Sequence, residues 1–223
     1  MKKSVGVVVI VLLVNSLFVN AQERNFGVVG GLNLANIRGD RAESINSSWR
    51  LAYHFGIFSN ISLSDKIALE PRILFSSKGY DDEIDFDQLG FAESNGSTIS
   101  QNRVNYTSRN NYLSIPILFK YKIIDKISLD LGPEIAFLLY SKDVITKVDR
   151  EGFYAKGDVP DEGSGDFFLD YGAMAGVTFY FSTNASIQLN YFHGLSNLHR
   201  KNPIGDSTEN NSVIQLSLGY LIF

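Results

Sequence analysis

Charged side chains of both signs recur at alternate positions in several segments of this chain, and that spacing gathers them on one face of a β-strand. Enclosed together, they could relay protons, pass a solute or pair with one another. If such strands close into an eight-stranded barrel, its interior is only wide enough for side chains, so we expect pairing, with Arg72 or Lys78 matched to Glu134 or Asp130. The predicted network consists of His54, Glu70, Arg72, Lys78, Lys120, Asp130, Glu134 and Asp170, joined by Gln188, Asn190 and Gln215.

A second chemical candidate is the segment Phe192-His193-Gly194-Leu195-Ser196-Asn197, because outer-membrane lipid deacylases carry a histidine and a serine on a lipid-facing surface. Catalysis requires the base within hydrogen-bond reach of the hydroxyl. Residues three apart in a regular strand point to opposite faces, so His193 outward places Ser196 inward. We therefore predict no catalytic residues.

Metal chemistry has little support in the sequence. The three histidines, His54, His193 and His199, lack ligand spacing, and the chain has no cysteine for a thiolate site, a disulfide or a lipid anchor. Hard cations could bridge the acidic run at 81–87 to lipopolysaccharide phosphates, but the run lacks the glycine and terminal acid of a calcium loop. We expect a solvated loop face there, with no metal and no cofactor.

The elements that would position these residues follow a period of two. In the segment 67–80, for example, Ile67, Leu69 and Ile73 alternate with Glu70 and Arg72. The same alternation predicts eight strands, near 26–37, 49–63, 67–80, 110–122, 127–141, 167–181, 185–197 and 211–223. Pro71, Pro116 and Pro133 fall within these strands, where we expect bulges or unpaired positions because proline lacks an N–H.

The connections alternate in length, beginning with a long one. Short turns lie at 64–66, near 125–126 and at 182–184, whereas about 11, 29, 25 and 13 residues separate the other neighbours. Short periplasmic turns and long external loops are typical of outer-membrane barrels, and they place both termini in the periplasm. The prediction is an all-β fold, an eight-stranded antiparallel up-and-down transmembrane β-barrel. A secreted lipocalin-type barrel, with its apolar face inside, is the rival.

The first residues predict export. Lys2 and Lys3 precede an apolar run from Val5 to Val14, and Val19-Asn20-Ala21 offers a cleavage site. We expect a signal peptide at 1–21 and one barrel domain at 22–223. Cleavage would change the formal charge from −4 to −6, because two lysines and no acids are removed, and this acidity argues against nucleic acid as a partner.

Aromatic residues near both ends of the strands predict two interfacial girdles. The turn-end set is Phe119, Tyr121, Phe179, Phe181 and Tyr220, and the loop-end set is Tyr53, Tyr112, Phe137, Phe167 and Tyr191. The last strand should carry the assembly signal, Gly219, Tyr220 and Phe223, for the barrel-insertion machinery. Leu218, Tyr220 and Ile222 share one face, so either a bulge near Gly219 corrects the register or Phe223 points inward.

Several motifs, in order, resemble the PorT-like outer-membrane barrels of Bacteroidetes over nearly the whole mature chain. They are Gly30-Gly31-Leu32-Asn33-Leu34-Ala35-Asn36, Leu63-Ser64-Asp65-Lys66, Leu69-Glu70-Pro71-Arg72-Ile73-Leu74-Phe75-Ser76, Tyr112-Leu113-Ser114-Ile115-Pro116-Ile117-Leu118-Phe119-Lys120-Tyr121, Gly132-Pro133-Glu134 and Gly194-Leu195-Ser196-Asn197. The resemblance implies an eight-stranded barrel in a Gram-negative outer membrane, without a defined activity. The namesake of that family takes part in a secretion system for proteins with a C-terminal sorting domain.

The functional expectation is a non-catalytic barrel that acts through its external loops or as part of an envelope or secretion complex. Outer-membrane lipid and lipopolysaccharide would surround it, and a protein partner could dock on the long loops near 81–109 and 142–166. A narrow channel or small-ligand uptake barrel is one alternative, and a lipid-modifying enzyme is the other.

Overall fold

Eight long β-strands make up most of the computed structural model, which describes residues 24–45, 47–85, 103–148, 157–158, 169–198 and 208–222. The predicted signal peptide lies outside these residues. The strands are β1 (Arg24–Arg38), β2 (Arg50–Ser62), β3 (Ile67–Asp85), β4 (Arg103–Ile124), β5 (Ile127–Val148), β7 (Leu169–Tyr180), β8 (Ala185–Gly194) and β9 (Asn210–Leu221). A short helix, α2 (Asp40–Ser44), and a two-residue strand, β6 (Gly157–Asp158), complete the elements. No helix among these residues has the length and apolar character needed to cross a membrane.

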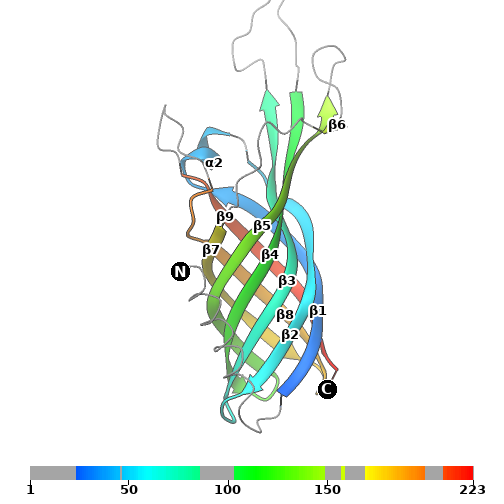
Figure 1. Ribbon diagram of the computed structural model, residues 1–223, viewed down its shortest axis with the longest axis vertical. Helices are drawn as coiled ribbons and strands as arrows, with labels where there is room; N and C mark the ends of the chain where they lie inside the picture. The colour runs from blue at the N-terminus through cyan, green and yellow to red at the C-terminus, as the bar shows by residue number, and fades with distance from the viewer. Residues whose placement is uncertain are drawn as a thin grey trace, which may run out of the picture.

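The long strands form one closed antiparallel ring. Each pairs with its neighbour along the chain, and β1 closes the ring on β9 in unbroken register from Gly27↔Leu221 to Arg38↔Asn210 (Figure 1). The short β6 pairs only with Val144 and Ile145 of β5, outside the ring. The predicted eight-stranded barrel is therefore confirmed, whereas α2 and β6 were not predicted.

The two faces of the ring have opposite character. Large apolar side chains point outward, with Leu131 and Leu218 each 62% exposed, while charged residues such as Lys78 and Asp170 point inward and are 0% exposed. A soluble barrel of lipocalin type would have the reverse arrangement, because its apolar face surrounds a ligand. An apolar outer face and a polar interior are the pattern of a transmembrane barrel, so the lipocalin alternative is excluded.

This arrangement can be tested at Leu131, on the outer face of β5. Leu131→Arg is expected to lower the free energy of unfolding in lipid vesicles by about 2 kcal/mol, because the guanidinium would enter hydrocarbon. Thr146→Arg is the matched control: Thr146 is exposed on the part of β5 beyond the ring, and its change should stay below about 0.5 kcal/mol. Urea titration of the folded fraction measures both variants, and equal effects would contradict a lipid-facing outer surface.

The three strand prolines coincide with gaps in the ladders. The β2–β3 ladder skips the position of Pro71, the β3–β4 ladder that of Pro116 and the β4–β5 ladder that of Pro133. Pairing resumes in the same register after each gap, so each proline is unpaired on one side only and causes no bulge. On the other side the ladders include Pro71↔Ile117, Pro116↔Glu134 and Pro133↔Ala173. The register shifts of the β4–β5 ladder lie elsewhere, near Asn105, Asn111 and Lys122. Of the two predicted solutions, the chain uses the unpaired one.

The strands β3, β4 and β5 are longer than predicted, and they continue past the ring at the end away from the short turns (Figure 1). Pairing between β3 and β4 runs on to Asp85↔Arg103, and pairing between β4 and β5 to Val104↔Val148. The region predicted as a loop near 81–109 therefore begins and ends as a strand, and the region near 142–166 begins as one.

Two predictions about the strand ends need correction. Tyr112 was assigned to the outer girdle, but it points inward and is 2% exposed, because the inward alternation along β4 includes it. The turn-end aromatic set does lie on the outer face, and Phe167 is outside the described residues. The β9 pairings keep one register through Gly219 and Tyr220, so the proposed bulge is absent there. Phe223 also lies outside the described residues.

Candidate functional site

All eight charged or imidazole side chains of the predicted lumen network face the interior, and none is more than 2% exposed. The barrel brings them together in three groups at different depths. One lies near the short turns, one spans the β1–β9 closure, and one lies toward the long connections. We call these ends of the barrel the turn end and the loop end.

The turn-end group contains two cations and two carboxylates. Arg72 donates through Nε and Nη2 to Glu70 Oε1, at 2.9 and 2.6 Å. Lys120 Nζ lies 2.9 Å from Asp130 Oδ2 and 3.5 Å from Glu70 Oε1, so it joins the two carboxylates. Thr178 and Gln188 accept further hydrogen bonds from Lys120 and Arg72. The predicted pairing of Arg72 with Glu134 or Asp130 is wrong. Glu70 lies two residues away on the same face of β3, at the same depth in the barrel as Arg72, and pairs with it instead.

The middle group ties the closing strands together. His54 on β2 contacts Asn33 Oδ1 on β1 through Nδ1 at 2.7 Å and Ser217 Oγ on β9 through Nε2 at 2.8 Å. The amide nitrogen of Asn33 donates to the carbonyl oxygen of Ser77, 2.9 Å away on β3. Asn33 Oδ1 therefore accepts the Nδ1 proton of His54. The sequence predicts His54 in the lumen, whereas Asn33 and Ser217 were not part of the predicted network.

The loop-end group centres on Lys78. Its Nζ lies 2.9 Å from both Glu134 Oε1 and Asp170 Oδ2, and all three side chains are fully buried. The ammonium also lies 3.9 Å from the centre of the Phe192 ring, and the negative face of an aromatic ring attracts a cation. Asp170 accepts further hydrogen bonds from Asn211 Nδ2 at 2.8 Å and Ser196 Oγ at 2.5 Å. The pairing of Lys78 with Glu134 was predicted, and the second carboxylate was not.

An apolar layer also fills part of the interior. It consists of Ala35, Leu118, Met174, Phe192 and Val213, each 0% exposed. A solute that crossed the barrel would have to displace this layer and separate the buried ion pairs. Such rearrangement is costly in a close-packed interior, which argues against the narrow-channel alternative.

The residues of the deacylase candidate lie on opposite faces of the barrel wall. His193 is exposed on the outer face, whereas Ser196 is 4% exposed and hydrogen-bonded to Asp170. The serine opposite His193 is Ser212 of β9, and its Oγ lies 2.9 Å from the hydroxyl of Tyr191. Within the described part of the chain, no serine hydroxyl is hydrogen-bonded to His193. The geometry therefore provides no Ser–His pair for nucleophilic attack.

The acidic run at 81–87 lies on β3 as far as Asp85, and the rest of it is outside the described residues. Asp81 accepts a hydrogen bond from Thr107 on β4 at 2.7 Å, and Asp82 is 8% exposed. Across the ranges that the structure describes, no three His, Cys, Asp or Glu side chains are grouped as metal ligands. His199 lies outside these ranges.

A closed ring of eight antiparallel strands, with apolar residues outside and ion pairs inside, defines an outer-membrane β-barrel protein. The family model "Outer membrane protein beta-barrel domain" matches residues 20–200, and the chain belongs to that family. No curated protein matches the chain.

Solved barrels of several Gram-negative bacteria are similar to the chain in fold. The attachment invasion locus protein Ail of Yersinia pestis is 12% identical, with a TM-score of 0.44 over 90% of this chain and 99% of that chain. Neisserial surface protein A is 10% identical, with a TM-score of 0.49 over 88% and 97%. OprG from Pseudomonas aeruginosa is 8% identical, with a TM-score of 0.43 over 91% and 98%.

Proposed function

We propose that this chain is a non-catalytic outer-membrane barrel that binds a protein partner through the parts of β3, β4 and β5 beyond the ring. These parts, at 80–85, 103–108 and 143–148, are named the projecting sheet. Its continuous pairing past the ring is the observation that carries the proposal. Ion pairs and an apolar layer fill the middle of the lumen, which favours recognition at the ends of the barrel, and the projecting sheet is the largest element there.

The composition of the projecting sheet supports a protein partner. Val144, Ile145 and Val148 are half-buried on a part of β5 that has neither the lumen nor the lipid-facing wall beside it. Thr146 and Glu83 add exposed polar contacts. A surface of β-branched apolar side chains with polar neighbours is suited to protein association rather than to catalysis.

The orientation and the processing of the chain are part of this proposal. The tight turns support a periplasmic turn end with both termini there, and the projecting sheet is then external. Residues 1–21 act as a cleaved signal peptide, and 22–223 form the barrel domain. Gly219, Tyr220 and Phe223 serve the barrel-insertion machinery, and lipid with lipopolysaccharide covers the outer wall. The resemblance to PorT-like barrels of Bacteroidetes supports an envelope complex, including one for secretion, as the setting.

A shortened variant tests the role of the projecting sheet. Residues 82–106 are replaced by an Asn-Gly turn that connects Asp81 to its partner Thr107, which leaves the lumen network intact. Envelopes of the native and shortened strains are cross-linked, and the proteins bound to the barrel are identified by mass spectrometry. We expect at least about a tenfold loss of the bound partner, because most of the β3 and β4 parts of the projecting sheet are removed and 143–148 of β5 lose their paired neighbours, while the folded band persists.

A second shortened variant, in the connection at 199–207, controls for the loss of any long connection. Full retention of the partner by the 82–106 variant would overturn the proposed interface. The secretion setting is tested separately, by comparing proteins in the medium of wild-type and deletion strains. Loss of sorting-domain cargo, restored by complementation, would support that setting, and unchanged export would remove it.

A further inference from the structure

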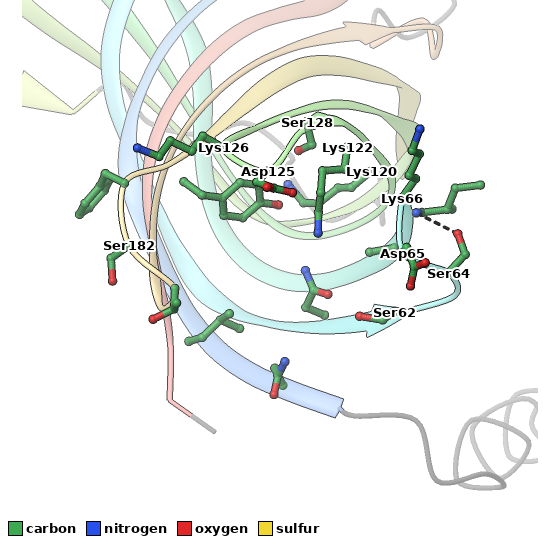
Figure 2. Close-up of a pocket in the computed structure, with 18 residues that line it drawn as sticks. Ser62, Ser64, Asp65, Lys66, Lys120, Lys122, Asp125, Lys126, Ser128 and Ser182 are labelled. Atoms are coloured by element: carbon green, nitrogen blue, oxygen red, sulfur yellow. Dashed lines mark hydrogen bonds between the residues drawn. The ribbon is translucent and has the colours of Figure 1, made fainter.

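The turn end of the barrel opens into a hollow of about 410 Å³. It is lined by the β2–β3, β4–β5 and β7–β8 turns and by the inward side chains of the adjoining strand ends (Figure 2). Lys120, in its paired position with Asp130, is among the lining residues and marks the inner limit of the hollow. This turn-end mouth is therefore a pocket that ends at the ion-paired core.

The mouth has a charge opposite to that of the whole chain. Its charged lining residues are four lysines and two aspartates, whereas the chain carries a formal charge of −4. Lys120 is neutralised by Asp130, but Lys66, Lys122 and Lys126 are exposed. Across the described ranges, none of these three makes an ion pair. With Asp65 and Asp125 also in the lining, these three lysines leave the mouth a formal charge of +1 (three minus two), and they offer three ammonium groups to an external anion.

The three lysines are anchored on a hydrogen-bonded backbone but spread across the mouth. Lys122 N donates to Lys66 O at 2.8 Å, and Tyr180 N donates to Lys126 O at 2.8 Å. Figure 2 shows Lys122 within the ring of strands, with Lys66 and Lys126 at different places on its rim. A single small anion is held by donors that converge on one point, whereas this spread matches a ligand with several separated charges.

Apolar groups lie between the charges. Tyr180 and Leu221 line the mouth and are both half-buried, so each presents some apolar surface to the hollow. An extended polypeptide segment that alternates carboxylate and apolar side chains matches both features, because its side chains alternate in direction.

We propose that the turn-end mouth binds an acidic polypeptide segment of a partner protein, with its carboxylates on Lys66, Lys122 and Lys126 and an apolar side chain against Tyr180 and Leu221. The segment enters from outside the ring and stops at the Lys120–Asp130 pair. The mouth lies at the opposite end of the barrel from the projecting sheet, so this binding is independent of the proposed function. With a periplasmic turn end, the partner is a periplasmic protein.

The test uses the purified folded barrel in detergent micelles and a fluorescein-labelled peptide of four Glu-Leu repeats. Fluorescence anisotropy should report saturable binding that weakens as sodium chloride is raised. The variant Lys66→Glu with Lys122→Glu should raise Kd at least about tenfold, because two attractive contacts become repulsive. The matched control, Lys142→Glu with Lys147→Glu on β5, reverses two lysines at the loop end and should leave Kd within about twofold.

Three outcomes would overturn the proposal. They are no binding of the acidic peptide, unchanged affinity in the Lys66/Lys122 variant, and equal affinity for a peptide of four Lys-Leu repeats. Inorganic phosphate is tested against sodium chloride at the same ionic strength. Complete displacement by phosphate alone would assign the mouth to a small anion instead. The folded band on unheated gels verifies that each variant retains the barrel.

Discussion

Replacing Lys78 with methionine is expected to lower the free energy of unfolding by about 3 to 5 kcal/mol, the usual cost of removing one partner from a buried ion pair. Lys78 is the cation between Glu134 and Asp170, and all three side chains are fully buried. Methionine has a similar length, so the change removes the charge while leaving little empty space. Two carboxylates would then face each other without a counter-charge in a medium that solvates them poorly.

The measurement is a urea titration of the refolded barrel in lipid vesicles, followed by the folded band on unheated gels. A triple variant, Lys78→Met with Glu134→Gln and Asp170→Asn, separates charge from packing, because it removes the cation and both anions together. We expect it to recover at least half of the lost stability. If Lys78→Met alone were as stable as the native barrel, the triad would contribute nothing to holding the strands together.

The sequence predicted which face of each strand is inside, but not the depth at which a side chain lies. Alternation assigns Arg72, Glu134 and Asp130 to the lumen, and all three are there. The tilt of the strands decides which inward residues meet, and the tilt depends on the register of the closed ring. Arg72 therefore pairs with Glu70 at the turn end, whereas Glu134 belongs to the loop-end group with Lys78.

Some uncharged partners were missed for a related reason. Gln188, Asn190 and Gln215 were predicted in the lumen, whereas Asn33, Ser217 and Asn211, which also point inward, were not. Their contacts with His54 and Asp170 depend on the register of the closed ring, which alternation along one strand does not give. The projecting sheet was missed because its strands read as polar loop sequence, and only the cross-strand pairing reveals their extension. The turn-end mouth is formed by three separate turns, so no local pattern could predict it.

The closure of the ring depends on a glycine, and Gly31→Ala is expected to lower the free energy of unfolding by about 3 kcal/mol, at the upper end of the cost of overpacking. Gly31 points inward on β1, beside β9. A β-carbon there would overlap the carbonyl oxygen of Leu216 and lie 2.7 Å from the Cα of Ser217. Both are backbone atoms, so no side-chain rotation relieves the clash, and β1 must move away from β9. The paired His54 side chain, which contacts both strands, would lose its geometry as well.

The preceding residue provides the control. A β-carbon at Gly30 would meet no atom closer than 3.6 Å, which is ordinary contact, so Gly30→Ala should change the stability by less than about 0.5 kcal/mol. The two variants differ by one position in the same strand and add the same methyl group.

Refolding yield and urea titration in vesicles compare them directly. If Gly31→Ala were tolerated, the backbones of β1 and β9 would have to lie farther apart at Gly31 than the structure places them. A selective loss at Gly31 would identify this contact as the point where the narrow ring is closed.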